Sequence, residues 1–218
     1  MNYKAIFFDF DDTLGNREAY AYECYRAILQ ENTDIEDPYE FEAVLQDCMM
    51  WDEQGNINKN HIKNMLKQEY GIELPYEDFN TYWDQQLWKY CRPFEDAEET
   101  LEQLQKRYKL GLITNGPSDG QRNKLRASGL ERFFDPDTIV VSGDYGYKKP
   151  DPRLFLQACR NLDVRPEESV YVGDIYGRDV LGAHRAGMTP VWICTHGKRA
   201  CGTEILTIYR ISEILEHF

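Results

Sequence analysis

The chain has 218 residues, with 25 Lys and Arg against 38 Asp and Glu, so its formal net charge is −13. This acidity argues against binding to a nucleic acid polymer or an anionic membrane, because Lys and Arg contacts to phosphate supply most of that affinity. With 42% hydrophobic residues, the chain can bury a sizeable core, and its length allows one large domain or a core domain that carries a smaller one.

The first predicted element is a short buried strand. Residues 4–8 form a nearly continuous apolar run that ends in acids, which is typical of a parallel strand covered on both faces. From there to residue 90 no sequence pattern typical of a strand occurs. Turn-forming residues separate helical patterns over 17–30, 38–50, 58–70 and 76–90. This part of the chain predicts a separate helical module.

Strands and helices alternate in the remainder of the chain. We expect helices over 96–107, 119–128, 151–161 and 176–186, and strands over 109–113, 138–141, 169–172 and 189–193. Such alternation implies right-handed crossovers and a parallel sheet with helices on both faces. The predicted fold class is therefore α/β: a doubly wound, Rossmann-like core from residues 1–15 and 94–218, with a helical module inserted at 16–93 and hinge candidates near 14–16 and 91–94.

Neither a membrane span nor a zinc site is expected. No apolar run approaches the roughly 20 residues that cross a bilayer, and the first residues lead into a strand rather than a signal-peptide core. The six Cys and four His are scattered without metal-ligand spacing, which favours reduced thiols. We expect a cytoplasmic protein with no membrane partner, whose oligomeric state the sequence does not predict.

Acidic side chains follow two predicted strands at the edge where such sheets bind ligands. Asp9 and Asp11 follow the first strand, and Asp174 follows the strand over 169–172. Acids in such places can simply form a turn or cap a helix. Alternation, however, sends Asp9 and Asp11 to one side, and three clustered carboxylates repel one another unless a cation lies among them. Mg²⁺ takes oxygen ligands and is usually shared with a substrate phosphate.

Four motifs each follow the end of a predicted strand. In chain order they are Asp9-Phe10-Asp11-Asp12-Thr13-Leu14, Thr114-Asn115-Gly116, Lys149-Pro150-Asp151-Pro152 and Val172-Gly173-Asp174, with Asp179 five residues on. Together they resemble the motifs of the haloacid dehalogenase-like hydrolases. The resemblance covers the whole chain, with residues 16–93 as a helical cap after the first motif, and the segment from Thr114 to Leu125 is similar to pyrimidine 5′-nucleotidases and acylneuraminate 9-phosphatases.

The resemblance implies a phosphatase that works through a covalent intermediate. Asp9 would attack phosphorus and form an aspartyl-phosphate, which water then hydrolyses. Asp11 would protonate the leaving alcohol and later deprotonate the water. Dehalogenases of this family lack an acid at that position, because halide leaves without a proton, so Asp11 favours phosphoryl chemistry.

Binding roles are also implied by the resemblance. Thr114 and the Asn115 amide would hold the transferring oxygens, and Lys149, rather than its neighbour Lys148, would offset their charge. The implied Mg²⁺ ligands are Asp9, Asp11 through its main-chain carbonyl, and Asp174, while Asp179 would orient a metal-bound water or Lys149.

The expected substrate is a small phosphorylated metabolite, such as a nucleoside monophosphate or a sugar phosphate. The cap contains Trp51, Trp83 and Trp88, which could stack a base, although aromatic residues at helical spacing are usually core. Arg17 is a candidate contact for a second anionic group, and its other interpretation is a solvated arginine at a helix start.

Two other activities stay open. A phosphomutase would use the same acids and differ only in whether a sugar or water accepts the phosphoryl group. The run from Gly116 to Gly120 also matches the nucleophile elbow of serine hydrolases, with Ser118 as nucleophile and Asp174 and His196 downstream. Thr114 and Asn115, however, occupy the place of the elbow serine, so this interpretation ranks below the phosphatase.

Overall fold

The computed structural model describes residues 2–218. The chain divides into two compact units: one joins the segment up to Asn16 with Pro93–Phe218, and the other is Arg17–Arg92. In the part of the chain that is described, no helix combines the length and the apolar character that a membrane span requires.

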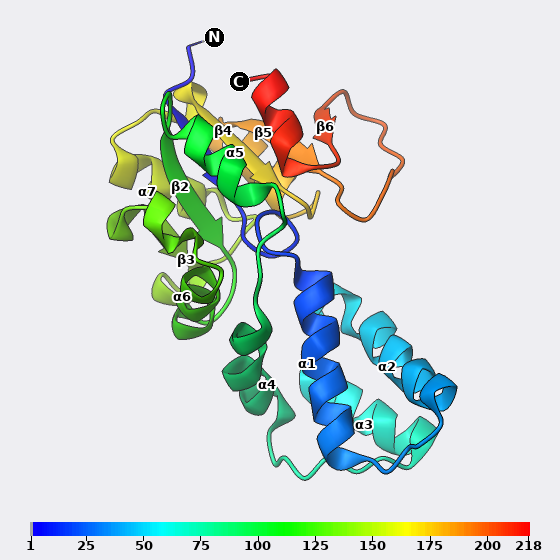
Figure 1. The fold of residues 1–218 in the computed structure, drawn as a ribbon. Helices are drawn as coiled ribbons and strands as arrows, with labels where there is room; N and C mark the ends of the chain where they lie inside the picture. The colour runs from blue at the N-terminus through cyan, green and yellow to red at the C-terminus, as the bar shows by residue number, and fades with distance from the viewer. Residues whose placement is uncertain (1) are drawn as a thin grey trace. The chain divides into compact units, whose positions relative to one another are not determined.

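The first unit is built on a six-stranded parallel sheet flanked by helices (Figure 1), which confirms the predicted fold class. The strand order is β3-β2-β1-β4-β5-β6. The strands are β1 (Ala5–Phe8), β2 (Lys109–Thr114), β3 (Ile139–Val141), β4 (Ser169–Gly173), β5 (Thr189–Ile193) and β6 (Leu206–Ile208). The helices of this unit are α5 (Ala97–Leu104), α6 (Ser118–Ala127), α7 (Pro152–Leu162) and α8 (Asp179–Ala186).

The central strand β1 sets the position of the site. All four of its residues are fully buried, and Phe8 pairs in register with Leu112 on one side and Val172 on the other. The chain adds β2 and β3 on one side of β1, then β4, β5 and β6 on the other. The strand order therefore reverses between β1 and β4, and ligands of such sheets bind beyond the carboxyl ends of the strands at this reversal.

Two features near the end of the chain differ from the predicted elements. Residues Leu206–Ile208 form a sixth strand, paired in parallel with β5, and Ile211–Glu216 form a 3₁₀ helix. The strand has only three residues, too few for an apolar alternation to stand out from the neighbouring loop. Pairing with β5 stabilises it instead.

The second unit contains four α-helices, which are labelled α1 to α4 in Figure 1. The fourth predicted helix begins later than expected, at Phe79, because the Asp78 carboxylate accepts a hydrogen bond from Asn80 N and caps it there. Trp83 is buried, and its ring centroid lies 4.2 Å from that of Tyr25, so this tryptophan is part of the core. The helices are α1 (Arg17–Asn32), α2 (Pro38–Asp52), α3 (Lys59–Tyr70) and α4 (Phe79–Leu87), followed by the 3₁₀ turn Trp88–Tyr90.

A buried ion group joins three of these helices. Arg17 Nη1 lies 2.6 Å from Asp52 Oδ2, Lys59 Nζ pairs with Asp52 Oδ1, and the Tyr25 hydroxyl donates to the same Oδ1 at 2.9 Å. Burial alone would raise the pKa of Asp52, but Arg17 and Lys59 outweigh it and lower that pKa. The expectation of a solvated Arg17 is wrong, because an arginine at this helix start is needed to neutralise Asp52.

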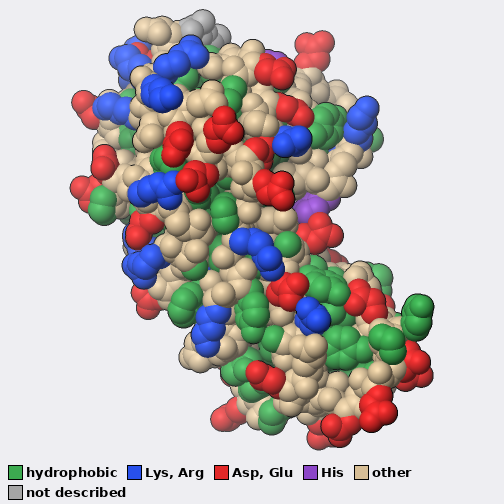
Figure 2. All heavy atoms as spheres, in the orientation of Figure 1, with side chains coloured by type: hydrophobic (Ala, Val, Ile, Leu, Met, Phe, Trp, Pro, Cys, Tyr) green, Lys and Arg blue, Asp and Glu red, His purple; other side chains and the backbone are tan. Residues whose placement is uncertain are grey.

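The surface agrees with the acidic composition. Figure 2 shows Asp and Glu side chains spread over the viewed face among Lys and Arg side chains. The negative charge on that face is therefore distributed rather than gathered into one patch.

Candidate active site

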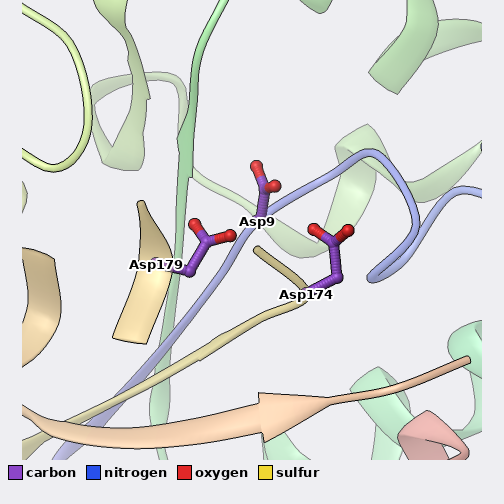
Figure 3. A group of neighbouring side chains, drawn as sticks. All are labelled: Asp9, Asp174 and Asp179. Carbon is purple, nitrogen blue, oxygen red and sulfur yellow. The ribbon is translucent and has the colours of Figure 1, made fainter. Parts of the chain in front are cut away.

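Three buried carboxylates from different elements meet at the reversal of strand order. Asp9 follows β1, Asp174 follows β4, and Asp179 is the first residue of α8. One carboxylate oxygen from each residue lies within 4.8 Å of the other two. Figure 3 shows the three side chains grouped beside one another. Each of the three residues is at most 7% exposed, so water does not screen their mutual repulsion. Nearby cations or protonation of a carboxyl group must therefore offset this repulsion.

The first balancing cation is Lys149. Its Nζ lies 2.8 Å from Asp9 Oδ1 and 2.7 Å from Asp179 Oδ1, and it donates to the Tyr171 hydroxyl at 2.9 Å. Burial would lower the pKa of Lys149, but Asp179 and Asp9 outweigh burial and raise it. Lys149 is therefore a fixed positive charge beside Asp9.

Asp179 is already engaged by protein donors. Besides Lys149, the Tyr171 hydroxyl lies 2.9 Å from its Oδ1, and Ile175 N donates to its Oδ2 at 2.9 Å. Tyr171 lies within β4 and is not among the residues that the sequence motifs indicate. These contacts place Asp179 where it holds Lys149 in position.

Asp174 retains an unsatisfied oxygen. Trp192 Nε1 donates to its main-chain carbonyl at 2.9 Å, which fixes the backbone, but among residues 2–218 its buried Oδ1 has no hydrogen-bond partner. Burial, reinforced by Asp179 and Asp9, raises the pKa of Asp174 well above its usual range. An unpaired buried carboxylate oxygen costs free energy, and a hard divalent cation would satisfy it. These residues therefore fit Mg²⁺.

The protonation state of the Asp9 carboxyl group depends on its burial and on the charges of Lys149 and Asp179. Burial raises its pKa, Lys149 opposes that rise, and Asp179 adds to it, so that the pKa reaches about 7. A second cation beside Asp9 and Asp174 would favour the ionised form. The charge of this carboxyl group therefore depends on Lys149, and a cation bound by Asp9 and Asp174 would act on it in the same direction.

The second motif contacts the segment that carries Lys149. Asn115 Oδ1 accepts from Lys149 N at 2.9 Å, and Asn115 Nδ2 donates to Lys149 O at 3.2 Å. The Thr114 hydroxyl, at the end of β2, donates to Gln121 Oε1 at 3.2 Å. Both predicted phosphate-binding residues therefore lie at this edge of the sheet, and Asn115 also aligns the main chain of Lys149.

The Asp11 side chain lies outside the carboxylate cluster. Its Oδ2 forms an ion pair with Lys124 Nζ and accepts a hydrogen bond from Gln121 Nε2 at 3.3 Å. Neither partner was assigned to the site from the sequence. The spacing of Gln121 and Lys124 is the sequence signal for a shared contact, because residues three apart on a helix lie on one face.

Ser118 and His196 have other partners than a serine hydrolase requires. The Ser118 hydroxyl accepts from Arg122 Nε at 3.3 Å, and His196 Nε2 lies 3.3 Å from Asp12 Oδ1. Neither contact is the serine–histidine pair that activates such a nucleophile.

Gly116 is the one position of the second motif where any side chain would be strained. Its φ is +145°, and a Cβ there would lie 2.6 Å from Gln121 Nε2. We expect Gly116→Ala to lower the free energy of unfolding by about 1–3 kcal/mol, measured by urea denaturation. Gly146→Ala is the control, because it also has a positive φ but nothing within 4 Å. Equal losses in both variants would show that the contact with Gln121 is unimportant.

Comparisons with known proteins agree with this geometry. Residues 6–193 match the model of the haloacid dehalogenase-like hydrolase family. A glyceraldehyde 3-phosphate phosphatase of Methanopyrus kandleri is 34% identical over 200 residues, covering 87% of this chain and 83% of its own. The human N-acylneuraminate-9-phosphatase is 35% identical over 136 residues, covering 60% of this chain and 54% of its own.

A solved structure supports the fold. The magnesium-bound hydrolase YfnB from Bacillus subtilis has a TM-score of 0.79 and 24% sequence identity, over 100% of this chain and 99% of its own. The sequence match, the six-stranded parallel sheet and the acids that follow β1 and β4 lead to one assignment. The chain belongs to the haloacid dehalogenase-like hydrolase family.

Proposed function

We propose that the protein is a Mg²⁺-dependent phosphatase that hydrolyses a small phosphorylated metabolite through an aspartyl-phosphate on Asp9. The observation that carries the proposal is the pairing of Asp9. Its carboxylate lies 2.8 Å from the fixed cation of Lys149 and within 4.8 Å of a carboxylate oxygen of Asp174, whose buried Oδ1 has no hydrogen-bond partner among residues 2–218. The relatives named above are phosphatases, which supports a phosphoric monoester hydrolase.

Each residue would contribute a separate part of the chemistry. Asp9 attacks phosphorus, and Lys149 offsets the charge that gathers on the transferring oxygens. Asp11 gives a proton to the leaving alcohol and takes one from the water that hydrolyses the intermediate. Thr114 and Asn115 hold the transferring group at the end of β2.

The metal would be held by Asp9, the main-chain carbonyl of Asp11, and Asp174. Bound Mg²⁺ supplies positive charge that neutralises the phosphoryl oxygens and favours the ionised form of the carboxylates. Asp179 supports this arrangement indirectly, since its contacts keep Lys149 beside Asp9.

The proposed substrate class rests on the substrates for which the relatives are named. Glyceraldehyde 3-phosphate phosphatase and N-acylneuraminate-9-phosphatase are named for small alkyl phosphates, and a sugar phosphate or nucleoside monophosphate belongs to the same class of monoesters. These phosphatases transfer the phosphoryl group to water, which favours hydrolysis over the phosphomutase reaction. We propose the helical unit as the cap and the sheet unit as the catalytic core.

The proposed function is tested by phosphate release across a panel of such monoesters. Phosphoserine, glyceraldehyde 3-phosphate, sugar phosphates and nucleoside monophosphates are each incubated with the protein, with Mg²⁺ or with a chelator. We expect metal-dependent release from at least one of them. Release that persists in the chelator, or no release at all, would contradict the proposal. Labelling of Ser118 by a fluorophosphonate would instead favour the serine hydrolase.

Metal binding has a test that does not depend on turnover. Mg²⁺ stabilises only the folded state, so we expect the melting temperature to rise with its concentration. Asp174→Asn should need at least about tenfold more Mg²⁺ to reach the same rise in melting temperature, because it removes a charged ligand. Asp144→Asn, which changes an acid with a partly exposed side chain, should respond like the wild type. An unchanged shift in Asp174→Asn would exclude Asp174 as a ligand.

A further inference from the structure

Lys124 is a buried cation at the site to which the mechanism above assigns no role. It lies on α6 and is 5% exposed. Its Nζ forms an ion pair with Asp11 Oδ2 and lies 5.8 Å from the centroid of the Phe10 ring. A lysine is rarely so buried without a specific partner, and its partner here is the proposed proton donor and acceptor.

Gln121, one turn earlier on α6, contacts the same carboxylate oxygen. Its Nε2 donates to Asp11 Oδ2 at 3.3 Å and to Asn115 O at 3.0 Å, while its Oε1 accepts from the Thr114 hydroxyl. These partners fix the orientation of the amide. Asp11 Oδ2 is therefore held by a cation and an amide, both from one helix face.

We propose that Lys124 is a positioning residue for Asp11: its ion pair holds the carboxylate where it can exchange a proton with the leaving oxygen. Gln121 assists by linking Asp11 to Thr114, so that the acid and the end of β2 keep a fixed separation. This inference rests on the proposed function and adds α6 to its machinery. Lys124 itself need not touch the substrate.

The inference predicts a dependence on the leaving group. Phenyl phosphate and 4-nitrophenyl phosphate differ by one nitro group. Phenolate, whose conjugate acid has a pKa near 10, nevertheless needs a proton on leaving more than nitrophenolate does. The ratio kcat/KM reports the step in which the leaving group departs. We expect Lys124→Met to lower kcat/KM at least about tenfold for phenyl phosphate, and less than about threefold for 4-nitrophenyl phosphate.

Three further variants make the test specific. Lys124→Arg keeps the charge and should recover much of the phenyl phosphate activity. Asp11→Asn should show the same leaving-group pattern, and adding Lys124→Met to it should cause little further loss, because the two act as a unit. Arg126→Met removes an exposed cation from the same helix and should leave both activities unchanged.

The possible failures can be told apart. Equal losses on both esters in Lys124→Met, or full additivity with Asp11→Asn, would overturn the role of Lys124 and leave the phosphatase assignment intact. If the wild type with Mg²⁺ hydrolyses neither ester nor any member of the metabolite panel, the proposed function fails, and the inference fails with it. If Lys124→Met does not fold, the same comparison is made with Lys124→Gln, and with Gln121→Leu for the second contact to Asp11 Oδ2.

Discussion

Replacing Asp9 with Asn is expected to reduce metal-dependent phosphate release by about 10⁴-fold or more, since the amide cannot form the acyl phosphate. The fold should survive, because Asn has nearly the same shape and Lys149 keeps its contact with Asp179 at 2.7 Å. The substitution also removes a buried carboxyl whose pKa is raised to about 7 by burial. The measurement is the initial rate with Mg²⁺ on the best monoester of the panel.

The matched control for Asp9→Asn is Asp12→Asn, in the same loop. Asp12 is also buried, but it pairs with His196 and lies outside the carboxylate cluster. We expect its variant to lose far less activity than Asp9→Asn. Activity within tenfold of the wild type in Asp9→Asn would contradict covalent catalysis by Asp9.

The second large effect is expected on stability, at the buried ion group of the helical unit. Asp52→Asn leaves Arg17 and Lys59 buried without their anion, which should lower the free energy of unfolding by about 3–5 kcal/mol. Loss of the hydrogen bond from Gly55 N, 2.7 Å from Oδ2, would add to this. The measurement is urea denaturation, and Glu53→Gln, at the exposed neighbouring acid, should change stability little.

Acid should remove the difference between wild type and Asp52→Asn. The pKa of Asp52 in the folded state lies below its usual value of 3.8, so the ionised group contributes stability above that pH. This contribution is lost as the pH falls through the folded-state pKa. We expect a constant difference in unfolding free energy at neutral pH that shrinks below about pH 4. A difference that does not depend on pH would show that the Asp52 charge is not its source.

Local sequence patterns predicted most of the fold because they reflect burial. The apolar run of β1 and the regular alternation after Pro93 indicate strands between crossover helices, and the structure contains them. The strand at Leu206–Ile208 was missed because it depends on pairing with β5 rather than on its own residues. Arg17 was misjudged for a related reason: its partner Asp52 is distant in the sequence, at the end of another helix.

At the candidate site, the sequence predicted the residues that follow strand ends. Asp9 and Asp174 each follow a strand of the parallel sheet, and the strand order brings them together. Their positions directly after predicted parallel strands are enough to predict this proximity. The supporting side chains were not predictable in this way. Tyr171, Gln121 and Lys124 reach the site from a strand interior and a helix face, and their roles depend on side-chain directions that spacing alone does not determine.

The most direct test of the account is to trap the covalent intermediate. The protein is mixed with Mg²⁺ and its best substrate, quenched during turnover, and treated with borohydride, which reduces an acyl phosphate to the alcohol. Mass spectrometry then locates the modified residue. We predict that Asp9 becomes homoserine only when substrate and Mg²⁺ are both present. Steady turnover with an unmodified Asp9, or with the phosphoryl group on Ser118, would contradict the account.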